Sequence, residues 1–153
     1  MKLSTKGRYG LRALIDLAVN CQEDAVSIQS IAKRQHISDN YLEQLMARLK
    51  KAGLVTSSRG ACGGYRLSRP AEEISVGEVL RALEGNIDAV TCPGNETDGG
   101  CETADMCVTR FVWKKINDSI TETVDNIMLE ELVEESRKLI QKKGADCSLN
   151  CEN

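Results

Sequence analysis

The first seventy residues carry the feature that constrains the fold most, because apolar residues recur there every three or four positions in three short runs. That spacing places apolar side chains on one face of a helix and predicts three amphipathic helices. Asp16 falls between the apolar positions of the first helix and is expected on its solvent face. Ser27 can cap the second helix, and Ser38 or Asn40 can cap the third, which Gly53 ends. The expected apolar faces are Tyr9, Leu11, Leu14, Leu17 and Ala18, then Ile28, Ile31 and Ala32, and finally Tyr41, Leu42, Leu45 and Leu49.

Two β-prone runs follow at residues 54–56 and 65–67, and a glycine-rich stretch at 58–64 separates them. This pattern predicts a β-hairpin with a glycine-rich tip. Two short helices joined by a tight turn, expected here at residues 35–37, and followed by a hairpin make a winged helix-turn-helix. Aromatic residues make up only 3% of the chain, which favours small helical layers over one thick core. The sequence therefore predicts a mainly α fold with a small β-hairpin wing.

The second half of the chain predicts a short helix, a loop and a long helix. Ser75 and Glu78 have the spacing of a capping box, and the helix that they begin ends at Gly85. From Val108 onward, apolar residues recur nearly four positions apart, as in a narrow seam that packs against another helix. The seam consists of Val112, Ile116, Ile120, Val124 and Ile127. Such a seam needs a partner.

These patterns divide the chain into four parts. Residues 1–85 are expected to form a winged helix-turn-helix DNA-binding domain, and residues 86–107 a cysteine-rich cluster-binding loop. Residues 108–141 are expected to form the dimerisation helix and a following short helix. Residues 142–153 are polar and are expected to form a frayed tail.

The net charge of −3 hides an uneven distribution of charged residues. Residues 1–70 contain twelve Lys and Arg against five Asp and Glu, a net charge of +7, whereas the rest contains eight against eighteen, a net charge of −10. A basic half indicates a polyanionic partner, and we expect double-stranded promoter DNA. Charge alone equally fits a solvated basic face. No run approaches about 18 apolar residues and no signal peptide is recognisable, so a cytoplasmic protein without a membrane partner is expected.

In a winged helix-turn-helix, the first residues of the second helix of the motif reach base edges in the major groove. Asn and Gln can pair with adenine and Glu can accept from cytosine. An arginine at the tip of the wing can enter the minor groove. The candidate DNA-binding residues are therefore Ser38, Asp39, Asn40, Tyr41, Glu43 and Gln44 on the helix and Arg59 and Gly60 on the wing, with phosphate contacts expected from Lys2, Lys6, Arg8, Lys33 and Arg34. The competing interpretation is a winged helix that binds protein or only packs.

Three of the seven cysteines, Cys92, Cys101 and Cys107, fall in a single glycine-rich stretch and are the candidate metal ligands. Eight and five residues separate them, which is too loose for a zinc ribbon, whose ligands come in close pairs. Three thiolates favour a soft metal or an iron-sulfur cluster. Cys21 and Cys62 are expected to occupy small-residue sites. The cluster of glutamates at residues 130–135 is expected to be a solvated helix face, and nothing in the sequence predicts an enzyme.

Five segments together carry a resemblance to a known family: KGRYGLRALIDLA, ISDNYLEQLMARLKKAGLV, SSRGACGGYRLS, ISVGEVLRALEG and a C-x8-C-x5-CVTRFVW motif. In this order they resemble the Rrf-type transcriptional regulators, in particular the members that depend on an iron-sulfur cluster. The resemblance extends over nearly the whole chain up to about residue 140. It implies a homodimer with a long crossing helix and a [2Fe-2S] cluster held by Cys92, Cys101 and Cys107.

The same resemblance assigns further roles. It implies that Glu43, Gln44 and either Ser38 or Asn40 read bases while Arg59 lies in the minor groove. It also implies control of promoters of cluster-assembly or iron and sulfur genes, with the cluster-assembly machinery as the cluster donor. Cluster insertion would then order the cysteine loop at the base of the dimerisation helix and change DNA binding.

The sequence departs from this family at the fourth cluster ligand. Related proteins carry a histidine three residues after the last cysteine, where this chain has Arg110, and arginine stays protonated and cannot bind a metal. Nitric-oxide-sensing relatives use an N-terminal aspartate, in the segment that reads Lys6-Gly7-Arg8 here. The single histidine, His36, is expected to be structural or to face phosphate. The fourth ligand stays open among Glu102, Asp105, Thr109, water, Cys147 and Cys151.

Two alternatives to the cluster-dependent regulator remain at this point. A nitric-oxide or redox sensor of the same fold would share every feature except the signal. A small iron-sulfur electron carrier would hold a cluster too, but it would need no basic wing and no salt-dependent DNA affinity.

Overall fold

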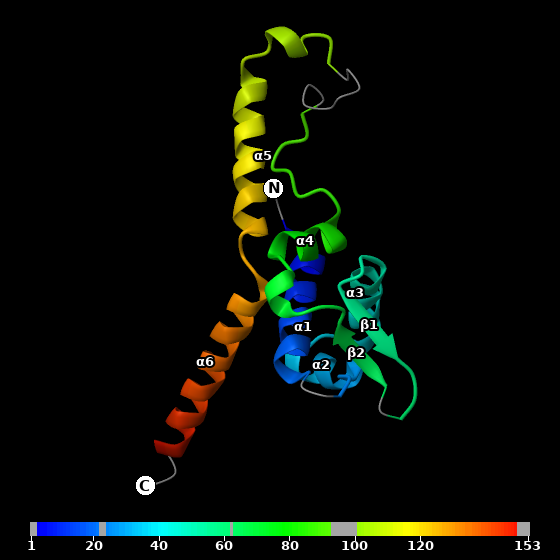
Figure 1. The fold of residues 1–153 in the computed structure, drawn as a ribbon. Helices are drawn as coiled ribbons and strands as arrows, with labels where there is room; N and C mark the ends of the chain where they lie inside the picture. The colour runs from blue at the N-terminus through cyan, green and yellow to red at the C-terminus, as the bar shows by residue number, and fades with distance from the viewer. Residues whose placement is uncertain (1–2, 22–23, 62, 93–100, 150–153) are drawn as a thin grey trace.

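The structure, a computed structural model, describes residues 3–21, 24–61, 63–92 and 101–149, and Figure 1 shows how the elements are arranged. A body formed by the helices α1 to α4 and one hairpin carries two further helices, α5 and α6, which extend from it in opposite directions. Lys2, Cys62 and Cys151 lie outside the described residues. In the described part of the chain, no helix is long and apolar enough to span a membrane.

The amino-terminal helices form as the sequence predicts. They are α1 (Thr5–Asn20), α2 (Ile28–Gln35) and α3 (Asp39–Lys51). The Ser27 side chain accepts a hydrogen bond from the Ser30 backbone and caps α2, as expected. His36 then adopts a left-handed conformation with φ 54°, which ends α2 and turns the chain into α3. Its place in this turn agrees with the structural role expected of it.

The wing is a two-stranded antiparallel hairpin made of β1 (Val55–Ser58) and β2 (Gly64–Leu67), with Val55 opposite Leu67. Val26 pairs with Tyr65 on the other side of β2, through hydrogen bonds of 2.8 and 2.9 Å. This close approach requires a glycine at position 64, because a Cβ there would lie 2.4 Å from the Val26 carbonyl oxygen. The hairpin is therefore attached to the segment that leads into α2.

The remaining elements are η1 (Ala71–Glu73), α4 (Val76–Glu84), η3 (Ala104–Met106), α5 (Thr109–Asp125) and α6 (Leu129–Leu149). The predicted capping box is present at the start of α4: the Ser75 side chain accepts from the Glu78 backbone, and the Glu78 carboxylate accepts from the Ser75 backbone. The elbow between α5 and α6 is attached to the same place, because Val76 N donates to Ile127 O and Leu129 N donates to Ile74 O.

The hydrophobic core lies between α1, α2, α3, α4 and the start of α6. Its largest fully buried side chains are Leu14, Leu17, Ile31, Leu42, Leu45, Met46, Leu49, Leu54, Ile74, Leu83 and Leu129. Leu129 and Val133 belong to α6 and are buried in this core. The sequence predicts a short helix here and a frayed tail from residue 142, but α6 continues to Leu149. Its first turns complete the amino-terminal domain because their apolar residues cover the core of that domain.

The sequence predicts that Asp16 faces solvent, and this prediction is wrong. Its side chain is only 5% exposed and accepts hydrogen bonds from the Arg34 guanidinium, the closest at 2.7 Å, and from the Gln35 amide at 3.0 Å. A carboxylate can be buried when its charge is paired and its oxygens are hydrogen-bonded. Asp16 therefore joins α1 to α2, and the guanidinium of Arg34, expected to contact phosphate, is bonded inside the domain.

Candidate DNA-binding surface and cysteine loop

Helix α3 presents a fully polar face at its start. Ser38 is its N-cap residue, in extended conformation, and its side chain makes no capping hydrogen bond. Helix α3 begins at Asp39, so the alternative cap at Asn40 is not the one used. Leu42, Leu45, Met46 and Leu49 fix the rotation of α3 because they are buried in the core. The side chains of Asp39, Asn40, Glu43 and Gln44 are exposed as a consequence.

Tyr41 differs from the other candidate DNA-binding residues because its side chain lies against α1. Its hydroxyl is 3.0 Å from the Thr5 hydroxyl, and its ring meets the Tyr9 ring edge-on with 6.2 Å between centroids. Edge-to-face aromatic pairs stabilise the contact between their elements. Tyr41 thus supports the start of α3 from the side of α1.

The wing stands beside α3, and its tip carries Arg59 and Gly60. Both residues are exposed, and Gly60 has a φ of 113°, which favours glycine over residues with a side chain. Lys50 was not among the sequence-based candidates, yet its ammonium group donates to the Ser57 hydroxyl at 2.6 Å. This bond joins α3 to β1 and thereby fixes the position of the wing relative to α3. No local sequence pattern indicates it, because seven positions separate the two residues.

Positive charge surrounds this surface. Lys6, Arg8 and Lys33 are exposed on α1 and α2 and stay candidates for phosphate contacts. Arg12 is exposed too, but its guanidinium donates to Gln35 and lies 5.4 Å from the centre of the Tyr9 ring. Arg12 and Arg34 therefore help to hold α1 and α2 together.

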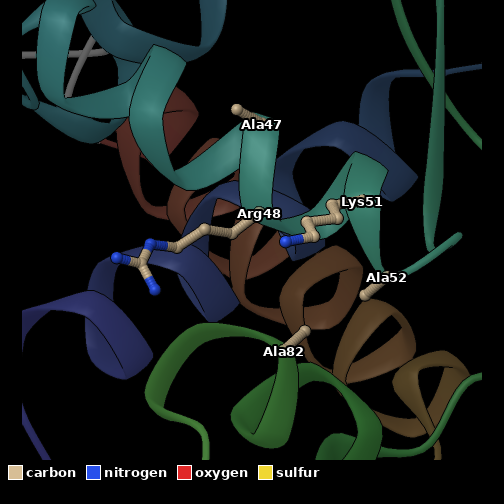
Figure 2. Close-up of a pocket in the computed structure, with 5 residues that line it drawn as sticks. All are labelled: Ala47, Arg48, Lys51, Ala52 and Ala82. Carbon is tan, nitrogen blue, oxygen red and sulfur yellow. The ribbon is translucent and has the colours of Figure 1, made fainter.

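A shallow hollow of about 670 Å³ lies between the end of α3 and α4, and Figure 2 shows its lining. The lining residues are Ala47, Arg48, Lys51, Ala52 and Ala82. Arg48 and Lys51 extend from α3 along the hollow, and the alanine side chains leave it open. Two cations and three methyl groups provide neither a nucleophile nor an acid–base pair. The lining therefore adds two cationic side chains and has none of the groups of an active site.

In the cysteine loop, two thiols occur in the same local arrangement. The Cys101 sulfur lies 3.4 Å from the Thr103 hydroxyl, and the Cys107 sulfur lies 3.1 Å from the Thr109 hydroxyl. The hydrogen bond with Thr103 lowers the pKa of the Cys101 thiol, and the bond with Thr109 lowers the pKa of the Cys107 thiol. A lowered pKa favours the thiolate, which is the form that binds metal.

Cys92, Cys101 and Cys107 are all free thiols, and each is partly exposed. Their chemistry fits an iron-sulfur cluster, whose irons take thiolate ligands. Among the residues that the structure describes, however, no three His, Cys, Asp or Glu side chains are gathered closely enough to hold a metal ion. The donors are thus present and accessible but not assembled around one point.

Arg110, three residues after Cys107, holds the turn between the two thiols. Its guanidinium donates to the Ala104 carbonyl at 2.7 Å and lies 3.8 Å from the Asp105 carboxylate. Of the candidate fourth ligands, Asp105 therefore lies beside a fixed positive charge, and Thr109 is bonded to the Cys107 sulfur. The Cys147 side chain and Cys151 lie outside the described part of the structure.

One residue that sequence reasoning missed connects the loop to α5. The Asn117 side chain forms hydrogen bonds with the backbone of Ala89 and Val90, just before Cys92. An asparagine inside a helix gives no signal of such a bond by itself, although its low helix propensity makes it an unusual choice there.

The apolar face of α5 is largely uncovered. Val108 just before the helix is 76% exposed, Phe111 is 67% exposed, and Val112 and Ile116 are exposed as well. No residue of α5 is buried. Toward its other end the helix meets the body, where Val124 packs against the cluster of Val76, Leu80 and Ile87. The carboxy-terminal part of the predicted seam therefore packs against the body of the same chain, whereas its amino-terminal part is exposed.

Comparisons with known proteins agree with this description. Residues 3–135 match the Rrf2 family, which is described as an iron-dependent transcriptional regulator. The chain is 47% identical over 133 residues to the HTH-type transcriptional regulator IscR of Pectobacterium carotovorum, and 45% identical to IscR of Escherichia coli. The aligned part is 87% of this chain and 79% and 80% of those two proteins.

Solved structures give the same assignment. The fold resembles that of CymR, the global cysteine regulator of B. subtilis, with a TM-score of 0.72, 41% identity, and 88% of this chain and 98% of that chain covered. It also resembles T. potens IscR, with a TM-score of 0.70, 44% identity, and 89% and 88% covered. These similarities confirm the predicted winged-helix fold, and the relatives are regulators of transcription and not enzymes.

Proposed function

The chain belongs to the Rrf2 family of iron-dependent transcriptional regulators, and on this basis we propose that it is an iron-sulfur-cluster-dependent regulator that binds promoter DNA as a homodimer. As the relatives are regulators and not redox enzymes, the electron-carrier alternative loses its support. The promoters we propose are those of cluster-assembly or iron and sulfur genes, the cluster donor is the cluster-assembly machinery, and the site of action is the cytoplasm.

The observation that carries the DNA-binding proposal is the unpartnered polar start of α3 beside the wing. Within the described part of the chain, the side chains of Asn40, Glu43 and Gln44 form no hydrogen bond or ion pair, although each can bond a base edge. Ser38, Asp39 and Tyr41 flank them, and Arg59 and Gly60 stand at the tip of the wing. The net charge of +7 in residues 1–70 supplies attraction to phosphate.

The proposed cluster ligands are Cys92, Cys101 and Cys107, and a bound [2Fe-2S] cluster would supply a labile redox centre that reports cluster supply. Three other residues favour cluster binding in two ways. Thr103 and Thr109 favour the thiolate form of Cys101 and Cys107. Arg110 fixes the turn between them through the Ala104 carbonyl. Because Arg110 cannot ligate, the fourth ligand comes from another group.

The free apolar face of α5 supports the homodimer. Val108, Phe111, Val112 and Ile116 form a stripe that a second copy of the same helix can cover. Such a dimer has two-fold symmetry, so the two copies of α3 would read a pseudo-palindromic site.

The connection between the cysteine loop and the DNA surface runs through α5. Its amino-terminal end carries Cys107 and its other end is attached to the body, where Arg81 forms an ion pair with Asp125. Ordering of the loop on cluster binding would shift α5 relative to its dimer partner and so change the spacing of the two recognition helices.

A redox sensor of the same fold is the second candidate. The neighbours include CymR of Staphylococcus aureus, solved also in an oxidized form, at 40% identity and a TM-score of 0.68 over 88% of this chain and 97% of that chain. The partly exposed Cys101 and Cys107 thiols, with their lowered pKa, would suit oxidation. In this case peroxide alone, without iron or sulfide, would change DNA affinity.

The test is anaerobic reconstitution with iron and sulfide, followed by absorption and paramagnetic resonance spectra and by DNA-binding titrations. We expect cluster spectra and a change in DNA affinity or sequence preference between cluster-loaded and cluster-free protein. A triple Cys92→Ala, Cys101→Ala, Cys107→Ala variant should behave as the cluster-free form under both conditions, and a Cys21→Ala variant is the matched control. Equal affinity and preference in all forms would remove the sensing role.

A further inference from the structure

We propose that Asn117 is the residue that positions Cys92 for the cluster, by anchoring the segment before Cys92 to α5. The proposal rests on the proposed function, because it assigns a role in holding the same cysteine loop. It goes beyond that function by naming a positioning residue on a helix that sequence analysis associates only with dimerisation.

The anchor consists of three hydrogen bonds from one side chain. The Asn117 oxygen accepts from Ala89 N at 3.0 Å and from Val90 N at 3.3 Å, and its amide nitrogen donates to Val90 O at 2.9 Å. A side-chain amide carries a carbonyl oxygen that accepts and an NH₂ group that donates, so it can bond to backbone donors and a backbone acceptor of the same peptide segment. Asn117 thus binds residues 89–90 as a neighbouring strand would.

A second set of contacts fixes the same segment on the side of α4. Ile87 is buried against Val76 and Leu80 of α4, and the Asn86 side chain accepts from Asp88 N at 2.7 Å and fixes the turn. Residues 86–90 are therefore held at both ends, by the core at Ile87 and by α5 at Val90. Cys92 follows two residues later, so the anchor restricts it to within about 7 Å of Val90.

The anchor matters because the three thiols belong to two different segments of the chain. Cys107 is attached to the amino-terminal end of α5 and Cys101 to the turn that Arg110 fixes, whereas Cys92 comes from the segment that leaves α4. The Asn117 bonds join residues 89–90 of this segment to α5. Positioning a ligand in advance removes conformational freedom that binding would otherwise have to remove.

The test compares Asn117→Ala with Asp118→Ala, a neighbour whose carboxylate is paired with the exposed Lys114. In the cluster-free protein, Asn117→Ala should speed amide hydrogen exchange in residues 86–92 and alkylation of Cys92, and leave alkylation of Cys101 unchanged. In the reconstituted protein, it should speed cluster loss to a chelator by about tenfold, as for other residues that orient metal ligands. Asp118→Ala should match the wild type in each measurement.

An Asn117→Asp variant separates positioning from packing. The aspartate has the size of asparagine and can still accept from Ala89 N and Val90 N, but it places an oxygen in place of the donor opposite the Val90 carbonyl. Its rates of amide exchange and of cluster loss should therefore lie between those of the wild type and of Asn117→Ala. Faster exchange with unchanged cluster loss would overturn the proposal, as would unchanged exchange. If the wild type takes up no cluster, the proposed function fails and the cluster role of Asn117 fails with it, while exchange and alkylation still decide whether the anchor exists.

Discussion

At the scale of single residues, the Asp16–Arg34 pair shows how a charged residue can belong to a core. Asp16 accepts from two side chains of α2 and has almost no contact with solvent, while the Arg34 side chain is 38% exposed. The hydrogen bond to Asp16 raises the pKa of Arg34, which is charged at any accessible pH in either case. The pair therefore orients α2, and with it the turn that leads to α3.

We predict that Asp16→Ala destabilises the protein by about 2 kcal/mol, because it leaves the Arg34 and Gln35 donors without their acceptor. The cost stays below that of a fully buried pair because water can reach Arg34. Urea unfolding measures the change, and Asp24→Ala, which removes an exposed carboxylate from the next loop, is the control. Equal unfolding midpoints for the two variants would contradict the prediction.

At the scale of elements, the start of α4 joins three parts of the chain. The Glu78 carboxylate accepts from the Ser75 backbone and from Arg69, which follows the wing, and Ser75 pairs with Met128 in the α5–α6 elbow. A capping box thus connects the base of the wing to the elbow. This is more than its local role of satisfying backbone donors at a helix end.

The same site gives a pH-dependent prediction. The Ser75 backbone hydrogen bond, followed by the Arg69 contact, holds the pKa of Glu78 below its ordinary value of 4.5, so the folded state binds this proton less readily than the unfolded state does. Its contribution to stability is present above pH 4.5 and is lost as the pH falls through the lowered value. Glu78→Gln should therefore reduce the loss of stability between pH 5 and 3, as thermal unfolding can measure. Glu72→Gln, an exposed change on η1, should keep the wild-type dependence on pH.

Helix α5 gives the second prediction at this scale. Val112 lies in the middle of the exposed apolar stripe, and a carboxylate there would have to be buried in the proposed dimer. Val112→Glu should convert the dimer to monomers in sedimentation experiments and weaken binding to a two-half-site operator. Lys114→Glu places the same side chain on the opposite face of the helix and should stay dimeric. A dimeric Val112→Glu protein would place the interface elsewhere.

At the scale of the whole molecule, the charge division sets how the protein meets DNA. Basic residues are concentrated on α1, α2, α3 and the wing, whereas the glutamates at residues 130–135 belong to α6, the helix that extends away from the body. This separation attracts phosphate to one region, and the acidic region limits nonspecific association elsewhere.

DNA affinity should consequently fall steeply with salt. Lys33→Gln should reduce the slope of log affinity against log salt by about two, because each protomer of the proposed dimer would lose one proposed phosphate contact. It should weaken binding to all DNA sequences alike. Lys138→Gln, on α6 and paired with Glu135, should leave the slope unchanged. An unchanged slope for Lys33→Gln would remove this lysine from the interface.

The amino-acid sequence by itself determined the features that depend on neighbours within a few positions. The helices, the Ser75–Glu78 capping box and the hairpin follow from periodicity and turn residues, and the order of Cys92, Cys101 and Cys107 is part of the sequence itself. These could be predicted because local geometry relates each residue to positions three or four away.

Only the tertiary structure decided the features that join distant positions. Asp16 is buried because Arg34 of another helix faces it, α6 belongs to the core because Leu129 meets helices from the other end of the chain, and Asn117 contacts a segment 27 or 28 residues away. The physical reason is that burial and hydrogen bonding depend on which surfaces pack together, whereas sequence periodicity shows only which face of an element is apolar.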